Sequence, residues 1–161
     1  MSVNRYPPHV LVLPEDDANR QLANGFLLNL DAAVLTRIQV LEEVGSWREV
    51  LDHFESDHRA EMARYSNRSM VLLIDFDGRE DRLQDAKTRI PIHLAERVFI
   101  LGALSEPEDL KRTGLGMYED IGSAMARDCR DETETTWGHD LLRHNADELA
   151  RLREQVRPIL F

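Results

Sequence analysis

The stretch Met70-Val-Leu-Leu-Ile-Asp-Phe-Asp-Gly78 decides the fold, because five consecutive apolar residues stop abruptly at an acidic turn. A strand with one wet face alternates apolar and polar residues, whereas a strand that is covered on both faces is apolar throughout. Two further apolar runs, at residues 9–13 and 97–104, lie before and after this stretch. The three runs predict buried strands of one parallel sheet.

Helical patterns separate these strands. Asp16 or Asp17 is placed to cap a helix after the first strand, and the apolar positions of that helix fall four apart at Ala18, Leu22, Phe26 and Leu30. A second helix is predicted over residues 47–62, behind a capping box, and residues 37–41 alternate like an edge strand. Strand–helix alternation predicts a Rossmann-like α/β fold, with an open, mostly parallel four-stranded sheet and helices on both faces.

The remainder of the chain is predicted to be helical. Residues 79–96 favour a short helix and a loop, and a further helix is expected from Tyr118 to Cys129. A last helix is expected from His139 to Arg157, with Pro158 ending it. The prediction is therefore one α/β domain over residues 1–161, with a helical extension from about residue 105 to the end.

Composition narrows the possible functions. Of the 161 residues, 42% are hydrophobic and 31% are charged, which is typical of a globular protein, and the net charge of −10 disfavours binding of nucleic acid through bulk charge. The longest apolar run, residues 98–104, is far below the roughly 20 residues that a membrane-spanning helix needs. A single cysteine and a start that lacks the pattern of a secretion signal favour a cytoplasmic location.

Acidic residues follow two of the predicted strands. Glu15, Asp16 and Asp17 come after the first strand, while Asp75 and Asp77 follow the central one. Ligands bind at the carboxyl ends of the strands in open α/β sheets, and carboxylate oxygens suit hard divalent cations. The sequence therefore predicts an Mg²⁺ or Mn²⁺ site, whose metal-ligating and catalytic residues are Glu15, Asp75 and Asp77. The alternative is that these residues are helix caps and solvated loop side chains.

This arrangement resembles the Toprim fold of topoisomerases, primases, small nucleases and the OLD-type nucleases that are paired with ATPases. In that family a glutamate follows the first strand, and Asp-x-Asp follows a later central strand of a small four-stranded parallel sheet. Glu15, Asp75 and Asp77 stand at the matching positions, and the resemblance covers about residues 9–104. One position departs from the family, because many Toprim proteins have glycine where this chain has Asp16.

The resemblance implies magnesium-dependent, nuclease-like cleavage or transfer at a phosphodiester. Asp75 and Asp77 would hold the cation, and Glu15 would position it or move a proton. Nucleic acid would be reached through the bound metal. Because the chain has little room for a separate DNA-binding module, a partner protein such as an ATPase is expected to bring the substrate. No feature of the sequence indicates the oligomeric state.

A non-enzymatic interaction or signalling module is the alternative class. Response-regulator receivers also carry an acidic pair after the first strand and an aspartate after the third. In that comparison Asp75 is the phospho-acceptor, Asp16 and Asp17 hold magnesium, and Ser105 is the switch residue. The chain departs from receivers after Ser105, where a helix from Tyr118 is predicted instead of a strand that ends in lysine.

Four other residues carry side chains that could act in catalysis or binding. Cys129 with His139 or His144 suggests a thiol nucleophile and its base, although a lone cysteine on an apolar helix face is commonly a buried hydrophobic residue. His139, Arg143 and His144 also suit contact with a phosphate or carboxylate at the start of a helix. The alternative for these three is a solvated helix start.

Two weaker patterns involve histidines and arginines. His53 and His58 are five residues apart, and on an α-helix they do not share a face, which disfavours a metal pair. Four arginines of the last predicted helix suit either a nucleic-acid patch or a solvated face that is paired with nearby acidic residues: Arg143, Arg151, Arg153 and Arg157.

Overall fold

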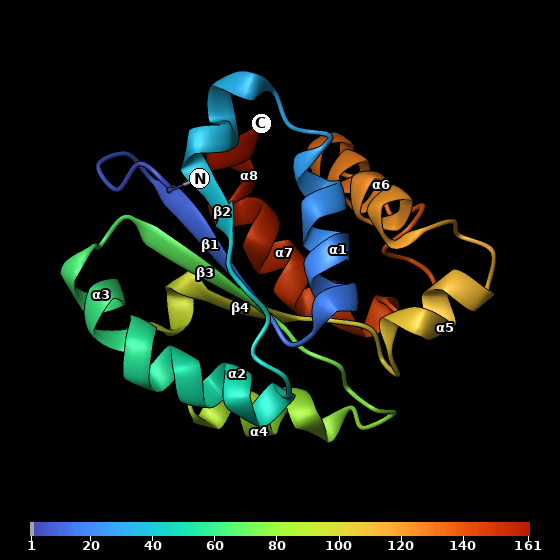
Figure 1. Cartoon of the computed structure of the whole chain (residues 1–161), viewed down its shortest axis with the longest axis horizontal. Helices are drawn as coiled ribbons and strands as arrows, with labels where there is room; N and C mark the ends of the chain where they lie inside the picture. The colour runs from blue at the N-terminus through green and yellow to red at the C-terminus, as the bar shows by residue number, and fades with distance from the viewer. Residues whose placement is uncertain (1) are drawn as a thin grey trace.

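The sheet has four strands, and all of them run parallel. The computed structural model describes residues 2–161 and places the strands in the order β2-β1-β3-β4 (Figure 1). The central strands are β1 (His9–Pro14) and β3 (Arg68–Leu73), and the edge strands are β2 (Ile38–Val40) and β4 (Val98–Leu101). The predicted open α/β fold is confirmed, including the edge position of the alternating strand.

Both faces of the sheet are buried, which explains the strands that are apolar throughout. Along β1, Val10 and Val12 join one core cluster, while Leu11 and Leu13 join the other. Successive side chains of a strand point to opposite faces, so a continuous apolar run is needed when both faces are covered. β3 follows the same rule, with Val71 in the first cluster and Leu72 in the second.

Two layers of helices cover the sheet (Figure 1). The first layer is formed by α1 (Asp17–Leu27), α5 (Pro107–Arg112), α6 (Tyr118–Asp131), α7 (Ala146–Gln155) and α8 (Arg157–Leu160). The second is formed by α2 (Trp47–His53), a π-helical segment η2 (Phe54–His58), α3 (Arg59–Arg64) and α4 (Asp81–Thr88). Short 3₁₀ segments lie at η1 (Ala32–Arg37), η3 (Ala95–Arg97) and η4 (Arg143–Asn145). Within residues 2–161, no helix is both long and apolar enough to cross a membrane.

The C-terminal helices pack directly into the core. α6 lies against α1, and two glycines allow their backbones to approach closely. A Cβ atom on Gly122 would clash with the carbonyl oxygen of Leu22, and one on Gly25 would clash with that of Glu119. Residues after β4 therefore complete one face of the domain, beyond the part that the Toprim resemblance covers.

The last helix begins later than the sequence pattern predicts. α7 starts at Ala146, and residues 139–145 form turns and a 3₁₀ segment. The buried Asn145 explains the difference, because its Nδ2 donates to the carbonyl of Gly102 at 2.9 Å and its Oδ1 accepts the N–H of that residue at 3.2 Å. This pairing ties the chain to the end of β4. Pro158 lies in the first turn of α8, after α7 has ended at Gln155.

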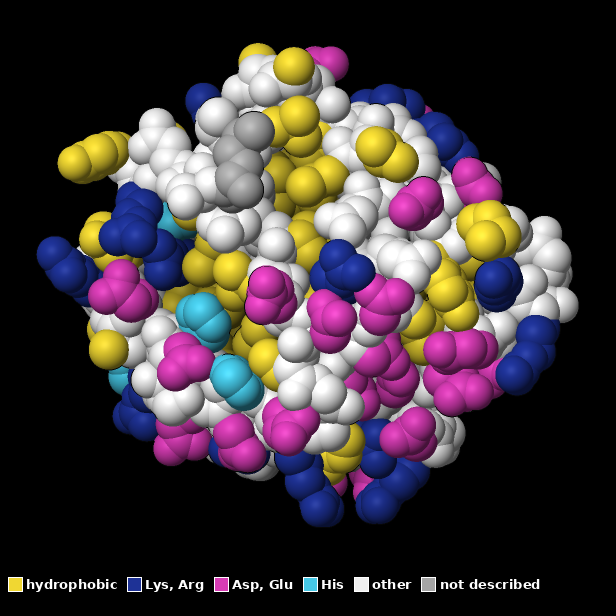
Figure 2. All heavy atoms as spheres, viewed as in Figure 1, with side chains coloured by type: hydrophobic (Ala, Val, Ile, Leu, Met, Phe, Trp, Pro, Cys, Tyr) yellow, Lys and Arg dark blue, Asp and Glu magenta, His cyan; other side chains and the backbone are white. Residues whose placement is uncertain are grey.

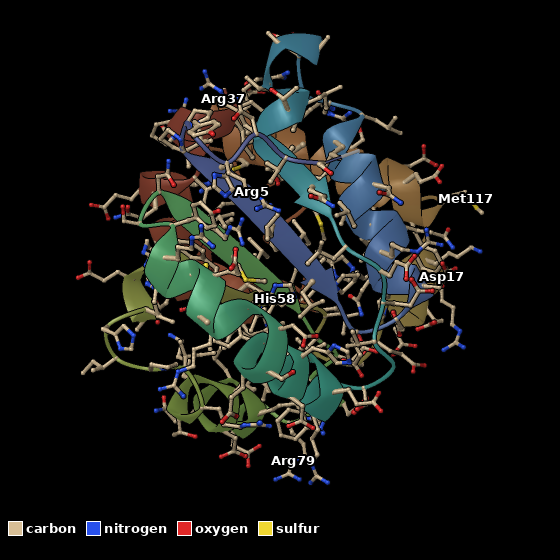
Figure 3. All side chains as sticks on the ribbon, turned by 60° about the vertical axis from the view of Figure 1, so that its left-hand side comes forward. Arg5, Asp17, Arg37, His58, Arg79 and Met117 are labelled. Atoms are coloured by element: carbon tan, nitrogen blue, oxygen red, sulfur yellow. The ribbon has the colours of Figure 1, made fainter. Side chains whose placement is uncertain are left out.

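The helix predicted over residues 47–62 is present but contains a π-helical turn. Ser46 caps it as expected, since its Oγ accepts the N–H of Glu49 at 3.2 Å. The segment η2 widens the helix in its middle, and a π-helix places residues five apart near one another. The expectation that His53 and His58 do not share a face is therefore wrong, because both line one cavity under this segment. His58 lies between η2 and the sheet (Figure 3).

Candidate functional site

The candidate site lies at the carboxyl ends of the two central strands. β1 and β3 pair in register from His9–Arg68 to Pro14–Leu73, so they end at the same level. Glu15 extends this ladder, and its N–H donates to the carbonyl of Leu73 at 2.9 Å. Acidic side chains gather at this end of the sheet, between α1 and α2 (Figure 2).

The side chain of Glu15 contacts the backbone of Asp75 at this end of the sheet. The Oε2 of Glu15 accepts the backbone N–H of Asp75 at 2.6 Å. Both residues are buried, with exposed fractions of 9% and 7%. Neither carboxylate forms an ion pair with a cationic side chain in residues 2–161. Two acidic groups therefore share a poorly solvated position, where the guanidinium of Arg82 attracts Glu15 without forming an ion pair with it.

Asn19 holds the Asp75 side chain from α1. Its Nδ2 donates to Oδ1 of Asp75 at 2.8 Å and to Oδ1 of Asp16 at 3.0 Å. Asp16 is the N-cap of α1, and its Oδ1 also accepts the N–H of Asn19 at 2.9 Å. Asp16 therefore acts as a helix cap, which is the structural alternative that its position suggested. Nothing in the sequence pattern singled out Asn19.

Asp77 is turned away from the buried pair. Its φ of 49° and the φ of 74° at Gly78 bend the chain, and its side chain is 56% exposed. Arg82 donates to Oδ2 of Asp77 at 2.5 Å and to the carbonyl of Asp75 at 2.8 Å. The guanidinium of Arg82 lies over the ring of Trp47, 4.7 Å from its centroid. Arg82 therefore fixes the acidic turn from α4, a role with no signature in the polar sequence around it.

Burial sets the charge state of the pair. Desolvation raises the pKa of Glu15 to about 7, although the N–H bond from Asp75 acts in the opposite direction. Desolvation likewise raises the pKa of Asp75 to about 8, against the hydrogen bond from Asn19 and with the help of the nearby Glu15 charge. In both cases the charged form is disfavoured, so the pair can hold protons near neutral pH or be neutralised by a cation.

The three predicted ligands do not converge as a set. In the part of the chain that the structure describes, no group of three or more His, Cys, Asp or Glu side chains is placed to hold a metal ion. The buried pair still suits Mg²⁺, which keeps several waters and is held by one or two carboxylates together with substrate phosphates. Glu15 and Asp75 supply two such carboxylates, and Asp77 is engaged by Arg82.

Of the residues in the receiver comparison, Asp16 lies close to Asp75, because Nδ2 of Asn19 donates to both side chains. Asp17 is exposed at the edge of α1 (Figure 3), where it accepts hydrogen bonds from Arg20 and Gln21. Asp16 is engaged as a cap. Ser105 belongs to the turn after β4, and its carbonyl accepts the N–H of Asp77 at 3.1 Å.

The cysteine and the two histidines that the sequence suggested have structural contacts. Cys129 is buried in the core, and desolvation raises the pKa of its thiol, which disfavours the thiolate. His139 accepts the N–H of Leu141 through Nδ1 at 3.1 Å. His144 packs edge-on against Phe76 with ring centroids 4.8 Å apart, so it supports the acidic turn from beneath.

The arginines near the C-terminus also have protein partners. Arg151 pairs with the buried Glu148 at 2.8 Å, and Arg157 donates to the carbonyl of Arg130 at 2.8 Å. Arg153 donates to the carbonyl of Asp128 at 3.2 Å. These bonds favour a structural role for the three arginines over a nucleic-acid patch.

Comparison with known proteins gives no independent assignment. No family model matches the chain, and no curated protein or solved structure matches it either. The function is therefore argued from the geometry of the site.

Proposed function

We propose that this protein is a Toprim-like, Mg²⁺- or Mn²⁺-dependent protein that acts on phosphodiesters, with Glu15 and Asp75 as the residues that hold the ion. One observation carries this proposal. The buried Glu15 carboxylate accepts the backbone N–H of Asp75, whose own carboxylate is also buried, and neither forms an ion pair with a cationic side chain in residues 2–161. A divalent cation compensates two such charges at once, whereas a protonated pair has no evident use for this shared geometry.

Each residue of the site has a distinct task in the proposal. Asn19 orients the Asp75 carboxylate, and Glu15 is held by the backbone of Asp75. In the proposal, both carboxylates would hold one ion. When bound, the ion stabilises charge on the attacking and leaving oxygens of the phosphodiester. Glu15 would position the ion or move a proton, as the Toprim resemblance implies. Asp77 becomes a further ligand where its pair with Arg82 opens.

Charge bears on how such a substrate reaches the site. The net charge of −10 opposes approach of a polyanion, so the proposal includes contact through the bound cation and delivery by a partner protein, such as an ATPase. The proposed setting is the cytoplasm, where a lone buried cysteine stays reduced.

Metal titration with isosteric variants tests this proposal. Wild type, Glu15→Gln and Asp75→Asn are titrated with Mg²⁺ and Mn²⁺ by calorimetry and assayed for nicking of supercoiled DNA. Asp17→Asn is the matched control, because Asp17 is a neighbouring carboxylate that is exposed and outside the pair. We expect wild type and Asp17→Asn to bind and nick, and both pair variants to lose about 100-fold or more of activity, as expected when several kcal/mol of charge stabilisation are removed.

Two results would count against the proposal. Absence of binding at millimolar metal in the wild type would favour a non-enzymatic interaction or signalling module that uses the acidic end of the sheet for partner contact. Equal binding by wild type and both pair variants would place the metal elsewhere. Binding without nicking would retain the metal site and move the search to other phosphodiester substrates or to a partner.

A further inference from the structure

An apolar cavity lies on the other side of Asn19 from the acidic pair. Its volume is about 80 Å³, and it sits between one face of the sheet and helices α1, α6 and α7. Its lining is aliphatic and aromatic, and includes Val12, Ala23, Met125 and Leu152. Hydrophobic side chains are visible in the depression between β2 and α1, the region where α8 lies in Figure 1 (Figure 2). The sheet face above α7 is therefore incompletely filled.

Two lining residues carry polar side-chain atoms among the residues described. The indole N–H of Trp137 is already donated to the carbonyl of Met125 at 3.2 Å. Asn19 is 1% exposed, and its Oδ1 has no hydrogen-bond partner among residues 2–161. The cavity thus contains one unsatisfied acceptor on an otherwise apolar wall.

The orientation of this amide follows from its partners. Nδ2 faces the oxygens of Asp16 and Asp75, which are acceptors when ionised, so the amide nitrogen must point toward them. The opposite orientation would set oxygen against oxygen. The contacts that build the acidic site therefore leave Oδ1 without a partner, in a residue that also lines the cavity.

Water is a poor occupant of such a space. A buried water makes about three hydrogen bonds, whereas this cavity offers one free acceptor. An apolar cavity of about 150 Å³ stays dry and binds benzene, so a space of about half that size suits a smaller apolar body or part of a ring. An unsatisfied buried acceptor destabilises the protein until a donor reaches it.

We propose that this cavity binds a small, uncharged ligand with an apolar body and one O–H or N–H group, which donates to Oδ1 of Asn19. A short-chain alcohol represents this class. The apolar body fills the space beside Ala23, and the donor satisfies the one free acceptor. The proposal does not depend on metal binding or on phosphodiester chemistry.

Paired probes test this site in the presence of EDTA. Ethanol and propane have similar sizes, but only ethanol carries a donor, and their binding is measured by NMR titration of the full chain. We expect saturable binding of both probes by the wild type. In Asn19→Leu, the ratio of ethanol affinity to propane affinity should fall about tenfold, as expected when one buried hydrogen bond is lost.

Cavity-filling variants supply the second arm. Ala23→Leu should abolish binding of both probes, and Ala103→Val is the alternative where Ala23→Leu does not fold, because both alanines line the cavity. Ala150→Leu is the control, since Ala150 is exposed on α7 and should leave binding unchanged. The proposal would be overturned if the wild type bound neither probe. An unchanged affinity ratio in Asn19→Leu would overturn the role of Oδ1. Neither result would test the proposed metal site at the acidic pair.

Discussion

The two ends of the central strands bury charge in opposite ways. At the amino ends, His9 and Arg68 face each other across β1 and β3, and they are 0% and 5% exposed. At the carboxyl ends, Glu15 and Asp75 are buried to a similar depth. The same strand pairing therefore carries a basic pair at one end and an acidic pair at the other.

Hydrogen bonds complete the amino end. Nε of Arg68 donates to Nε2 of His9 at 2.9 Å, so Nδ1 of that histidine carries the proton and donates to the carbonyl of Pro7 at 2.9 Å. The guanidinium of Arg68 lies 4.9 Å from the ring centroid of Tyr65. A neutral histidine thus meets a cation that an aromatic face stabilises.

The carboxyl end lacks such compensation, because two like charges adjoin and neither has a cationic partner among residues 2–161. The contrast separates a pair that stabilises the fold from a pair that destabilises it unless a proton or a cation is bound. Buried charges that lack a compensating partner are common at binding and catalytic sites. They are less common in pairs that serve only to stabilise the fold.

The largest effect on stability is expected at the amino end. Arg68→Ala should lower the free energy of unfolding by about 2–3 kcal/mol, because it leaves Nε2 of His9 without a donor and removes the contact with Tyr65. Arg64→Ala is the control, since Arg64 also lies over Tyr65 but is exposed, and its effect should stay below about 0.5 kcal/mol. Urea denaturation measures both, and equal losses would contradict the structural role of Arg68.

A gain in stability is expected at the carboxyl end. In EDTA at pH 8, Asp75→Asn should raise the free energy of unfolding by about 1–3 kcal/mol, because the neutral amide removes a buried charge whose pKa burial has raised. The substituted amide would keep an oxygen for the side-chain N–H of Asn19. Urea denaturation at pH 8 and pH 4 is the measurement, and the gain should disappear at pH 4, where the carboxyl is protonated in the folded protein. A loss of stability at pH 8 would show that the pair is not under electrostatic strain.

A change in pH should change the stability contributed by the two ends in opposite directions. The pKa of Glu15 rises from 4.5 to about 7 on folding, so its contribution to stability is complete below about pH 4.5 and is lost as pH rises through 7. Burial lowers the pKa of His9. Below pH 6.5 this histidine therefore binds a proton more readily in the unfolded chain than in the folded protein, so acidification lowers the stability of the fold. Relative to wild type in EDTA, Glu15→Gln should gain stability as pH rises and His9→Gln should gain it as pH falls. Parallel pH profiles for the two variants would refute this difference between the ends.

The smallest effect is expected at Asp77. Asp77→Asn should change the free energy of unfolding by less than about 0.5 kcal/mol, because its pair with Arg82 is solvated on the Asp77 side. Thermal or urea denaturation in EDTA at pH 8 gives the comparison with Asp75→Asn. A change as large as that of Asp75→Asn would mean that Asp77 belongs to the buried pair.

The sequence by itself determined the class of fold and the location of the acidic residues. Apolar runs at β1, β3 and β4 require burial on both faces, and parallel strands bring their carboxyl ends to one edge. Glu15 and Asp75 could therefore be placed at one edge from the order of residues alone. The capping role of Asp16 was equally readable, because caps depend on local spacing.

Only the tertiary structure decided which of these residues meet and what holds them. Asp77 leaves the pair because the chain turns there and Arg82, in the first turn of α4, binds its side chain. Asn19 joins the site through a contact that spans 56 positions of the chain. The late start of α7 depends likewise on the bonds between Asn145 and Gly102. Periodicity reports only the environment of each residue along its own element. Contacts between distant elements form only when the chain packs. The same packing buries Glu15 and Asp75 and so shifts their pKa values.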